Sequence, residues 1–441
     1  MAKIALVSLG CAKNQVDGEV MLGRLEKAGH ELVAEPAEAD VVIVNTCGFI
    51  EAAKEESINT ILELAQLKKR GLKGLVVAGC LAQRYAEELR QEMPEIDALL
   101  GTGDLDLVEE AVARVLAGDR PQLVGKGSYR LEGVAERVLL NPPHYAYLKI
   151  AEGCDNRCSY CAIPMIRGPY RSRPLPDLVA EARLLAEKGV KELILVAQDT
   201  TRYGLDLYGR RMLVDLLEAL HQVEGLAWIR LLYLYPTHLD EELIAAIGRL
   251  PRVCPYFDIP LQHVNDEILR WMNRPITGKQ IKSLLAKIRE MVPDAVLRTS
   301  LIVGFPGETE EQFRELMDFV AAVEFDRLGV FTYSQEENTP AAAMTPQVPE
   351  EVKEERYHRL MSLQQEISRR KNRAKVGKEL EVMIDGPAEG EEGLFAGRTR
   401  GDAPEVDGLV LVRGENLAPG DLVQVRVTHA FEYDLMGELL R

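Results

Sequence analysis

The sequence predicts a multidomain α/β protein: a Rossmann-like parallel α/β domain, an open barrel of six βα units, and a small OB-like antiparallel β-barrel. Three observations predict this fold class. Strand patterns alternate with helical patterns from residue 3 to 120, and they alternate again from 146 to 335. After residue 376 only short strands separated by Gly, Pro and Asp remain. The length of 441 residues suits two to four domains.

The first domain, residues 1–120, contains three short apolar strands, each of which leads into a cysteine. The strands are KIALVSLG, VVIVNTCG and GLVVAGCL, and the cysteines are Cys11, Cys47 and Cys80. Helical patterns between them, such as DGEVMLGRLEKAG, end in glycine. Parallel strands place their carboxyl ends at one edge of a sheet, so we expect the three thiols to converge there. The alternative is three unrelated buried cysteines.

Residues 121–145 contain Pro142 and Pro143 and are expected to form an irregular linker. The second domain, 146–350, has six predicted strands, which is short of the eight in a full TIM barrel. The strands are AYLKIAEG, KELILVAQ, WIRLLYLY, YFDIPLQ, VLRTSLIVG and RLGVFTYS. Residues 351–375 are predicted to form a charged, solvated connecting helix. Residues 376–441 are expected to form the terminal barrel.

The strongest local signal is the run Cys154-Asp155-Asn156-Arg157-Cys158-Ser159-Tyr160-Cys161, directly after the first barrel strand. Three thiolates in one short loop can bind three irons of a 4Fe–4S cluster and leave the fourth iron open. Tetrahedral zinc is the main alternative, but a structural zinc site needs four ligands, and no fourth lies at the usual spacing. Cys254 stands alone and is expected to be a buried bystander.

Composition excludes several classes of protein. Apolar residues make up 46% and charged residues 28%, and no apolar run reaches the roughly 18 residues of a membrane span. The start of the chain lacks the pattern of a signal peptide, so a cytoplasmic protein is expected. The net charge of −17 disfavours non-specific nucleic-acid binding. Residues 376–441 carry six Lys/Arg against fourteen Asp/Glu, a net charge of −8, which favours a basic protein partner over RNA.

The cysteine run resembles the radical S-adenosylmethionine signature C-x-x-x-C-x-aromatic-C, with Tyr160 at the aromatic position. The whole domain order resembles the methylthiotransferase family of these enzymes, whose small C-terminal barrel is a TRAM domain. The resemblance implies two 4Fe–4S clusters and S-adenosylmethionine as cofactors. It assigns Cys154, Cys158 and Cys161 to the radical cluster, and Cys11, Cys47 and Cys80 to a sulfur-carrying auxiliary cluster.

Several stretches are similar to the RimO subfamily, including GCAKNQVDGEVM, AQDTTRYGLDLYG, LYLYPTH and TRGDAPEVDG. That likeness implies an enzyme that adds a methylthio group to the β-carbon of an aspartate in small-subunit ribosomal protein S-twelve, free or on the subunit. An electron donor is also implied, and no stable tRNA binding is expected. The sister subfamily, which modifies tRNA adenosine, is the alternative function. A non-enzymatic iron–sulfur redox sensor is the second.

The remaining site residues follow from the resemblance and from their place after barrel strands. We expect Tyr160, Gln198, Arg298 and Gly304 to contact the cofactor. A core tyrosine, a structural ion pair and a simple βα turn are the alternatives for Tyr160, Arg298 and Gly304. Lys13 and Asn14, beside Cys11, are expected either to line the auxiliary site or to cap the following helix. No side chain is needed as a general base, because hydrogen-atom abstraction is the implied chemistry.

Overall fold

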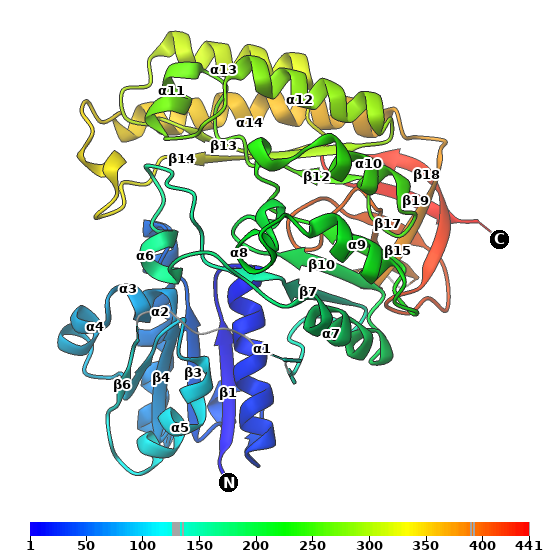
Figure 1. The fold of residues 1–441 in the computed structure, drawn as a ribbon. Helices are drawn as coiled ribbons and strands as arrows, with labels where there is room; N and C mark the ends of the chain where they lie inside the picture. Colours follow the sequence, from blue (N-terminus) through cyan, green and yellow to red (C-terminus); the bar gives the residue numbers. More distant parts are fainter. Residues whose placement is uncertain (126–132, 135, 389, 391–392, 441) are drawn as a thin grey trace.

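The computed structural model describes residues 1–125, 133–134, 136–388, 390 and 393–440 (Figure 1). Part of the expected linker (126–132 and 135) and positions 389, 391–392 and 441 of the expected terminal barrel lie outside the described residues. Figure 1 shows the N-terminal domain in blue beside the green barrel, with the C-terminal barrel in red at the barrel's other side. Among the residues that the structure describes, no helix combines the length and apolar composition that crossing a membrane requires.

The N-terminal domain is a parallel six-stranded sheet in the order β2-β1-β3-β4-β5-β6. Apolar side chains from both faces of this sheet pack against helices, as the continuous apolar strands predict. Its elements are β1 (Lys3–Ser8), α1 (Ala12–Lys27), β2 (Glu31–Leu32), β3 (Val41–Thr46), α2 (Glu51–Ala65), β4 (Gly74–Gly79), α3 (Cys80–Arg84), α4 (Ala86–Glu92), β5 (Ala98–Leu100), α5 (Val108–Leu116) and β6 (Gln122–Leu123). β6 therefore lies inside the segment expected to be a linker.

The central domain has the six parallel strands and six covering helices of an open barrel. Two three-stranded sheets, β11-β10-β7 and β12-β13-β14, are joined where the Leu234 N–H donates to the Asp258 carbonyl oxygen at 2.8 Å. The strands are β7 (Tyr145–Lys149), β10 (Glu192–Val196), β11 (Trp228–Leu231), β12 (Tyr256–Asp258), β13 (Val296–Val303) and β14 (Arg327–Thr332). The helices are α7 (Leu175–Glu187), α9 (Leu213–His221), α10 (Glu241–Arg249), α12 (Gly278–Met291), α13 (Glu310–Val323) and α14 (Glu350–Arg373). The predicted fold class is confirmed.

Shorter elements surround the start of the barrel. β8 (Ala151–Glu152) pairs with β9 (Arg171–Ser172) in an antiparallel ribbon that brackets the cysteine loop. α6 (Ile163–Arg167) lies between them, and α8 (Leu205–Tyr208) and α11 (Asp266–Trp271) follow later strands.

Helix α1 of the N-terminal domain fills the concave side of the open barrel. Alternate strand residues point to opposite faces of a sheet, so Leu193 and Leu195 pack outward on the barrel helices while Ile194 and Val196 point inward. The inward residues share one apolar cluster with Val16 of α1. The N-terminal domain is therefore docked into the barrel by apolar packing.

Helix α14 differs from the expectation of a solvated connector. One helical face is buried, and Leu360 and Ile367 belong to the main barrel core. The face is formed by Lys353, Arg356, Leu360, Gln364, Ile367, Ser368 and Asn372. The charged residues between these positions hide the helical repeat in the sequence. α14 packs against β14 and α13, as the sixth helix of the barrel does.

The C-terminal domain is a closed five-stranded barrel in the order β15-β16-β17-β19-β18. Its strands are β15 (Glu379–Pro387), β16 (Leu394–Arg398), β17 (Val410–Arg413), β18 (Leu422–Ala430) and β19 (Leu435–Leu439). Four neighbouring pairs are antiparallel and β17 pairs with β19 in parallel. One neighbouring pair is parallel because a closed ring with an odd number of strands cannot alternate direction throughout.

A buried ionic network fastens this domain to the amino ends of the barrel strands. Glu192 accepts from Arg230 at 2.6 Å and from Arg398 at 2.7 Å, and all three side chains are buried. Arg398 also binds Asp385, which accepts from His144. Burial alone would raise the pKa of Glu192, but Arg230 and Arg398 outweigh it and hold that pKa below its ordinary value.

The same interface uses part of the acidic charge of the terminal domain. Asp402 pairs with Arg327, Asp407 pairs with Arg298, and Glu405 accepts from the hydroxyl of Tyr145. The carboxylates of Asp402 and Asp407, like that of Asp385, thus contact cations of the barrel domain or of the interface, whereas Glu405 is exposed. Part of the negative charge that suggested a docking surface for a basic protein is therefore already neutralised within the chain.

We predict that Glu192→Gln lowers the free energy of unfolding by about 3 kcal/mol, because two buried guanidinium groups lose their shared counter-charge. Chemical denaturation followed by tryptophan fluorescence measures it, since Trp228 lies at this interface and donates to Glu381. Glu218→Gln breaks an exposed pair with Arg249 and should cost less than about 1 kcal/mol. Equal losses in the two variants would contradict the network's role.

Candidate functional site

Three cysteines meet at the carboxyl edge of the N-terminal sheet. Cys11 follows β1 and precedes α1, Cys47 follows β3, and Cys80 begins α3 after β4. A Cβ on Gly10 would lie 3.2 Å from the Cys47 sulfur, and the φ of Gly10 is +90°. Only glycine tolerates both this backbone conformation and this contact, so the loop before Cys11 can reach Cys47. The expected convergence therefore rests on a close backbone approach.

The thiols of this N-terminal triad (Cys11, Cys47 and Cys80) influence one another electrostatically. Burial, with a smaller contribution from the neighbouring thiols Cys80 and Cys11, raises the pKa of Cys47 to about 12. Burial also raises the pKa of Cys80. Cys11 is different: burial alone would raise its pKa, but the cations Lys13 and Arg167 outweigh burial and lower it. The triad is thus a partly buried set of sulfur ligands beside two positive charges.

Arg167 of α6 reaches from the barrel domain into the N-terminal triad. Its Nη2 donates to the Cys80 sulfur at 3.4 Å and to the Asn14 side-chain oxygen at 3.2 Å. Its Nη1 donates to Asp17 at 2.8 Å and to Glu152 at 2.9 Å. The side chain is fully buried. Arg167 therefore pairs with buried groups of both domains.

The second triad (Cys154, Cys158 and Cys161) lies on the loop after β8. The Asn156 side chain donates to Asp199 at 3.0 Å, and the Ser159 N–H donates to the Met272 carbonyl oxygen at 3.0 Å. Burial raises the pKa of Cys154 to about 11 and that of Cys161 to about 12, and the other thiols of the loop add to both shifts. The loop is thus tied to the segment that follows β10 and to the end of α11.

Arg274, which the sequence analysis did not identify, occupies the position at this triad that Arg167 occupies at the other. Its Nη1 donates to the Cys158 sulfur at 3.8 Å and to the Tyr160 hydroxyl at 3.4 Å. Its Nη2 donates to the Pro260 carbonyl oxygen at 2.6 Å, and its guanidinium lies 4.6 Å from the centre of the Tyr235 ring. Its only sequence signal is a position before a proline, far from the cysteine run.

Helix α6 connects the two triads directly. It begins two residues after Cys161, and its Ile166 packs with Ala162 and Cys80 in a small apolar cluster. The same helix ends at Arg167, which donates to Cys80. A single five-residue helix therefore spans the distance between a cysteine of one triad and a cysteine of the other.

Of the other residues predicted to contact the cofactor, Tyr160 and Gln198 lie near the cysteine loop. Tyr160 packs beside Phe305 in one apolar cluster near the second triad, and its buried hydroxyl has a pKa raised by burial and by Cys158. The Gln198 side-chain nitrogen donates to Glu152 at 3.0 Å, while its buried oxygen has no hydrogen-bond partner among the described residues. Both residues lie with the cysteine loop.

Arg298 and Gly304 are not brought to the cysteines in the same way. Arg298 donates to Asp258 at 2.7 Å and lies 3.6 Å from Asp407 of the C-terminal domain. Gly304 has a φ of +71°, and a Cβ there would lie 2.3 Å from Cγ of Lys353 on α14. Arg298 is thus in an ion pair, and Gly304 packs closely against α14. Cys254 is buried beside Arg230, away from both triads.

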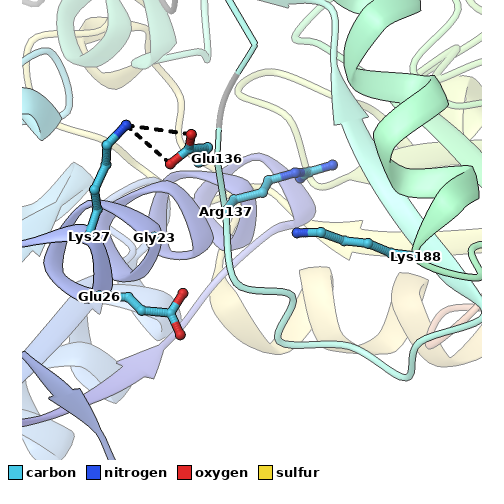
Figure 2. Close-up of a pocket in the computed structure, with 6 residues that line it drawn as sticks. All are labelled: Gly23, Glu26, Lys27, Glu136, Arg137 and Lys188. Atoms are coloured by element: carbon cyan, nitrogen blue, oxygen red, sulfur yellow. Dashed lines mark hydrogen bonds and ion pairs between the residues drawn. The ribbon is translucent and has the colours of Figure 1, made fainter. Parts of the chain in front are cut away.

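A separate cavity of about 330 Å³ opens at the other end of α1 (Figure 2). It is lined by Gly23, Glu26, Lys27, Glu136, Arg137 and Lys188. Figure 2 shows Lys27 reaching toward Glu136, and the ion pair measures 3.3 Å. Arg137 is held by Glu19 at 2.9 Å. No cysteine lines this cavity, so it is distinct from the candidate site.

The donor sets fit iron–sulfur clusters better than a single metal ion. Across the described parts of the chain, no three His, Cys, Asp or Glu side chains are grouped closely enough to hold one ion. A 4Fe–4S cluster spreads its thiolate ligands over different irons, and each triad offers three sulfurs with an arginine N–H to one of them. Each triad would leave one iron open for another ligand.

Comparison with known proteins assigns a family model to each domain. Residues 3–101 match the uncharacterized protein family UPF0004, residues 148–320 match the radical SAM superfamily, and residues 376–440 match the TRAM domain. The Pelotomaculum thermopropionicum protein named ribosomal protein uS12 methylthiotransferase RimO is 55% identical, with 99% of each chain covered. Proteins of the same name from Desulforamulus reducens and Clostridioides difficile are 54% and 50% identical, with at least 99% of each chain covered.

Solved structures show the same fold at low identity. The radical S-adenosylmethionine methyltransferase TsrM from Kitasatospora setae, with cobalamin and a [4Fe-4S] cluster bound, aligns with a TM-score of 0.56 at 18% identity. The alignment covers 77% of this chain and 76% of that one. The cobalamin-dependent radical enzyme OxsB aligns with a TM-score of 0.52 at 12% identity, covering 83% of this chain and 56% of that one.

Proposed function

This chain belongs to the RimO family of ribosomal protein uS12 methylthiotransferases, and from that membership we propose how its two cysteine triads share the reaction. The systematic name uS12 denotes ribosomal protein S-twelve. The radical SAM domain uses one 4Fe–4S cluster and S-adenosylmethionine. We assign that cluster to Cys154, Cys158 and Cys161. We assign a second 4Fe–4S cluster, which carries the sulfur, to Cys11, Cys47 and Cys80.

The observation that carries the proposal is the contact of α6 with both triads. Cys161 lies two residues before the start of the helix, and Arg167 at its end donates to Cys80. When bound, S-adenosylmethionine would supply on one-electron reduction a radical that removes hydrogen from the β-carbon of the target aspartate. A radical centre formed at one triad must lie near the sulfur held at the other, and α6 provides that proximity.

The two buried arginines would adjust the clusters. Arg167 donates an N–H to Cys80 and Arg274 donates one to Cys158. Hydrogen bonds to the sulfur ligands of iron–sulfur clusters make reduction easier, and burial keeps water away from the reactive centre. Both arginines hold their positions through further hydrogen bonds to carboxylates or carbonyl oxygens.

For the cofactor contacts we retain Tyr160 and Gln198. The unpartnered side-chain oxygen of Gln198 can accept a hydrogen bond from the amino group of S-adenosylmethionine, which would satisfy a buried acceptor. Tyr160, between Cys158 and the Phe305 cluster, can flank the adenine. We also keep Arg298 and Gly304 as proposed contacts, with Asp258 paired to the Arg298 guanidinium and Lys353 packed beside the Gly304 backbone.

The reaction also needs a one-electron donor and a protein substrate. We propose that uS12 is modified either free or on the small ribosomal subunit. Stable tRNA binding is not expected from a chain with a net charge of −17.

A competition assay tests the choice of substrate. Reconstituted enzyme, reductant, sulfide and S-adenosylmethionine are mixed anaerobically with uS12 and unmodified tRNA, and both are analysed by mass spectrometry. We expect a methylthio-for-hydrogen gain on the aspartate of uS12 alone. A gain on tRNA alone would overturn the substrate assignment. No gain on either, without 5′-deoxyadenosine, would favour an iron–sulfur sensor.

Iron analysis tests the assignment of the two triads. The intact protein should hold about eight irons, and replacing Cys11, Cys47 and Cys80 by Ala, or Cys154, Cys158 and Cys161 by Ala, should leave about four. Only the second replacement should abolish formation of 5′-deoxyadenosine. Cys254→Ala is the matched control, because that thiol is buried outside both triads, and it should keep the full iron content. A loss of about four irons from Cys254→Ala would contradict the assignment.

A further inference from the structure

Lys13 is a buried cation that has no carboxylate partner among the described residues. The residue is 7% exposed, and its ammonium lies 3.5 Å from the centre of the Tyr233 ring. Among the described residues, no carboxylate lies within ion-pair distance of it, and Asp17, one helical turn away, is paired with Lys149 and Arg167 instead. The buried Lys353, by contrast, has both a tyrosine ring and the carboxylate of Glu350. Burying an ammonium without a carboxylate partner is costly, so the retention of this charge needs a reason.

The position of Lys13 places that charge where the N-terminal triad meets the barrel. Lys13 lies two residues after Cys11, and its cation is one of the charges that lower the pKa of the Cys11 thiol. Tyr233 follows β11 at the carboxyl end of the barrel. The ammonium therefore lies between the proposed sulfur-carrying site and the face of the barrel where the radical is generated.

The ring that Lys13 contacts is held in a strained conformation. Tyr233 has a φ of +61°, a left-handed value that is unfavourable for a bulky residue. The Tyr233 N–H donates to the Asp258 carboxylate at 2.8 Å. The Tyr233 carbonyl oxygen accepts a hydrogen bond from the Thr200 N–H at 3.1 Å. Such strain persists only where surrounding contacts impose it, and it concentrates at functional sites. Here it directs the aromatic face toward the ammonium.

We propose that Lys13 binds the side-chain carboxylate of the target aspartate and so selects a protein substrate. The inference rests on the proposed function. The β-carbon of aspartate is bonded to its carboxylate, so a cation two residues from Cys11 that holds this carboxylate also holds the reacting carbon beside the sulfur site. A site built around a buried charge rejects a ligand that lacks the opposite charge. Lys13 is thus a specificity-determining residue.

The test compares Lys13→Met, Lys13→Arg and the unsubstituted enzyme on uS12 with its target aspartate and on uS12 with asparagine there. We expect the unsubstituted enzyme to favour the aspartate substrate strongly. Lys13→Met should lose roughly 100-fold in kcat/KM for that substrate, so that its preference falls toward unity. Lys13→Arg should keep the preference. If Lys13→Met loses activity equally on both substrates, the residue is structural and the inference is overturned.

Two further measurements separate this inference from other failures. We expect Lys13→Met to keep the iron content and the 5′-deoxyadenosine formation of the unsubstituted enzyme. A loss of about four irons would show that Lys13 supports the auxiliary cluster, and it would overturn the assignment of Lys13 to the substrate carboxylate. Lys353→Met, a buried lysine on α14, is the matched control and should keep the aspartate preference.

Peptide binding tests the carboxylate site at Lys13 even if the proposed function is wrong. If the unsubstituted enzyme adds nothing to uS12, the substrate assignment is wrong, but calorimetry with a peptide containing the target aspartate, and with its asparagine counterpart, still tests the carboxylate site. Tighter binding of the aspartate peptide that disappears in Lys13→Met supports it. Equal binding of the two peptides by the unsubstituted enzyme overturns it.

Discussion

The buried guanidinium of Arg167 is the interaction on which the catalytic region depends. It is the last residue of a helix that begins beside the second triad, yet its partners Asp17, Asn14 and Cys80 belong to the N-terminal domain. Desolvating an arginine is expensive, and it is offset only because two carboxylates and two further acceptors surround it. Removing the guanidinium would leave Asp17 and Glu152 short of a buried counter-charge, so the two domains are fixed relative to each other by a contact at the site itself.

The wider architecture reinforces that arrangement from three directions. Val16 and its neighbours on α1 fill the open side of the barrel, so the helix that starts at Cys11 cannot move independently of the strands that carry the second triad. The buried carboxylate of Glu336, after β14, receives both Arg84 and Lys54 of the N-terminal domain. At the amino ends of the strands, Glu192 and its arginines anchor the C-terminal barrel. Apolar packing holds the three domains together, and the buried ion pairs fix how the domains are positioned relative to one another.

Much of this could be predicted from the sequence, because strand patterns and cysteine spacing are local signals. The six barrel strands are strongly apolar. Cys47 and Cys80 follow a strand directly and Cys11 follows one after two residues, so parallel pairing brings all three to one edge. The spacing within Cys154 to Cys161 marks its chemistry without any tertiary information. In both cases the deciding information lies within a few residues.

The rest depends on partners that are distant in sequence. Arg274 reaches Cys158 across 116 positions, and nothing around it marks a cluster residue. The acidic stretch of the C-terminal domain suggests a docking surface in the sequence, but in the structure Arg298 and Arg327 form ion pairs with two of its carboxylates. The buried face of α14 is hidden because Lys353 and Arg356 bury their stems while their charges find partners. Burial of charged residues is the common reason why these features escape local analysis.

The central claim is that the two triads form one site, and magnetic coupling between the bound clusters tests it most directly. Electron paramagnetic resonance spectra of the reduced protein are compared with those of the two variants that each lack one triad. If α6 holds the clusters close together, the spectrum of the intact protein will show spin–spin broadening and faster relaxation that neither variant shows. A spectrum equal to the sum of the two variant spectra would contradict the account.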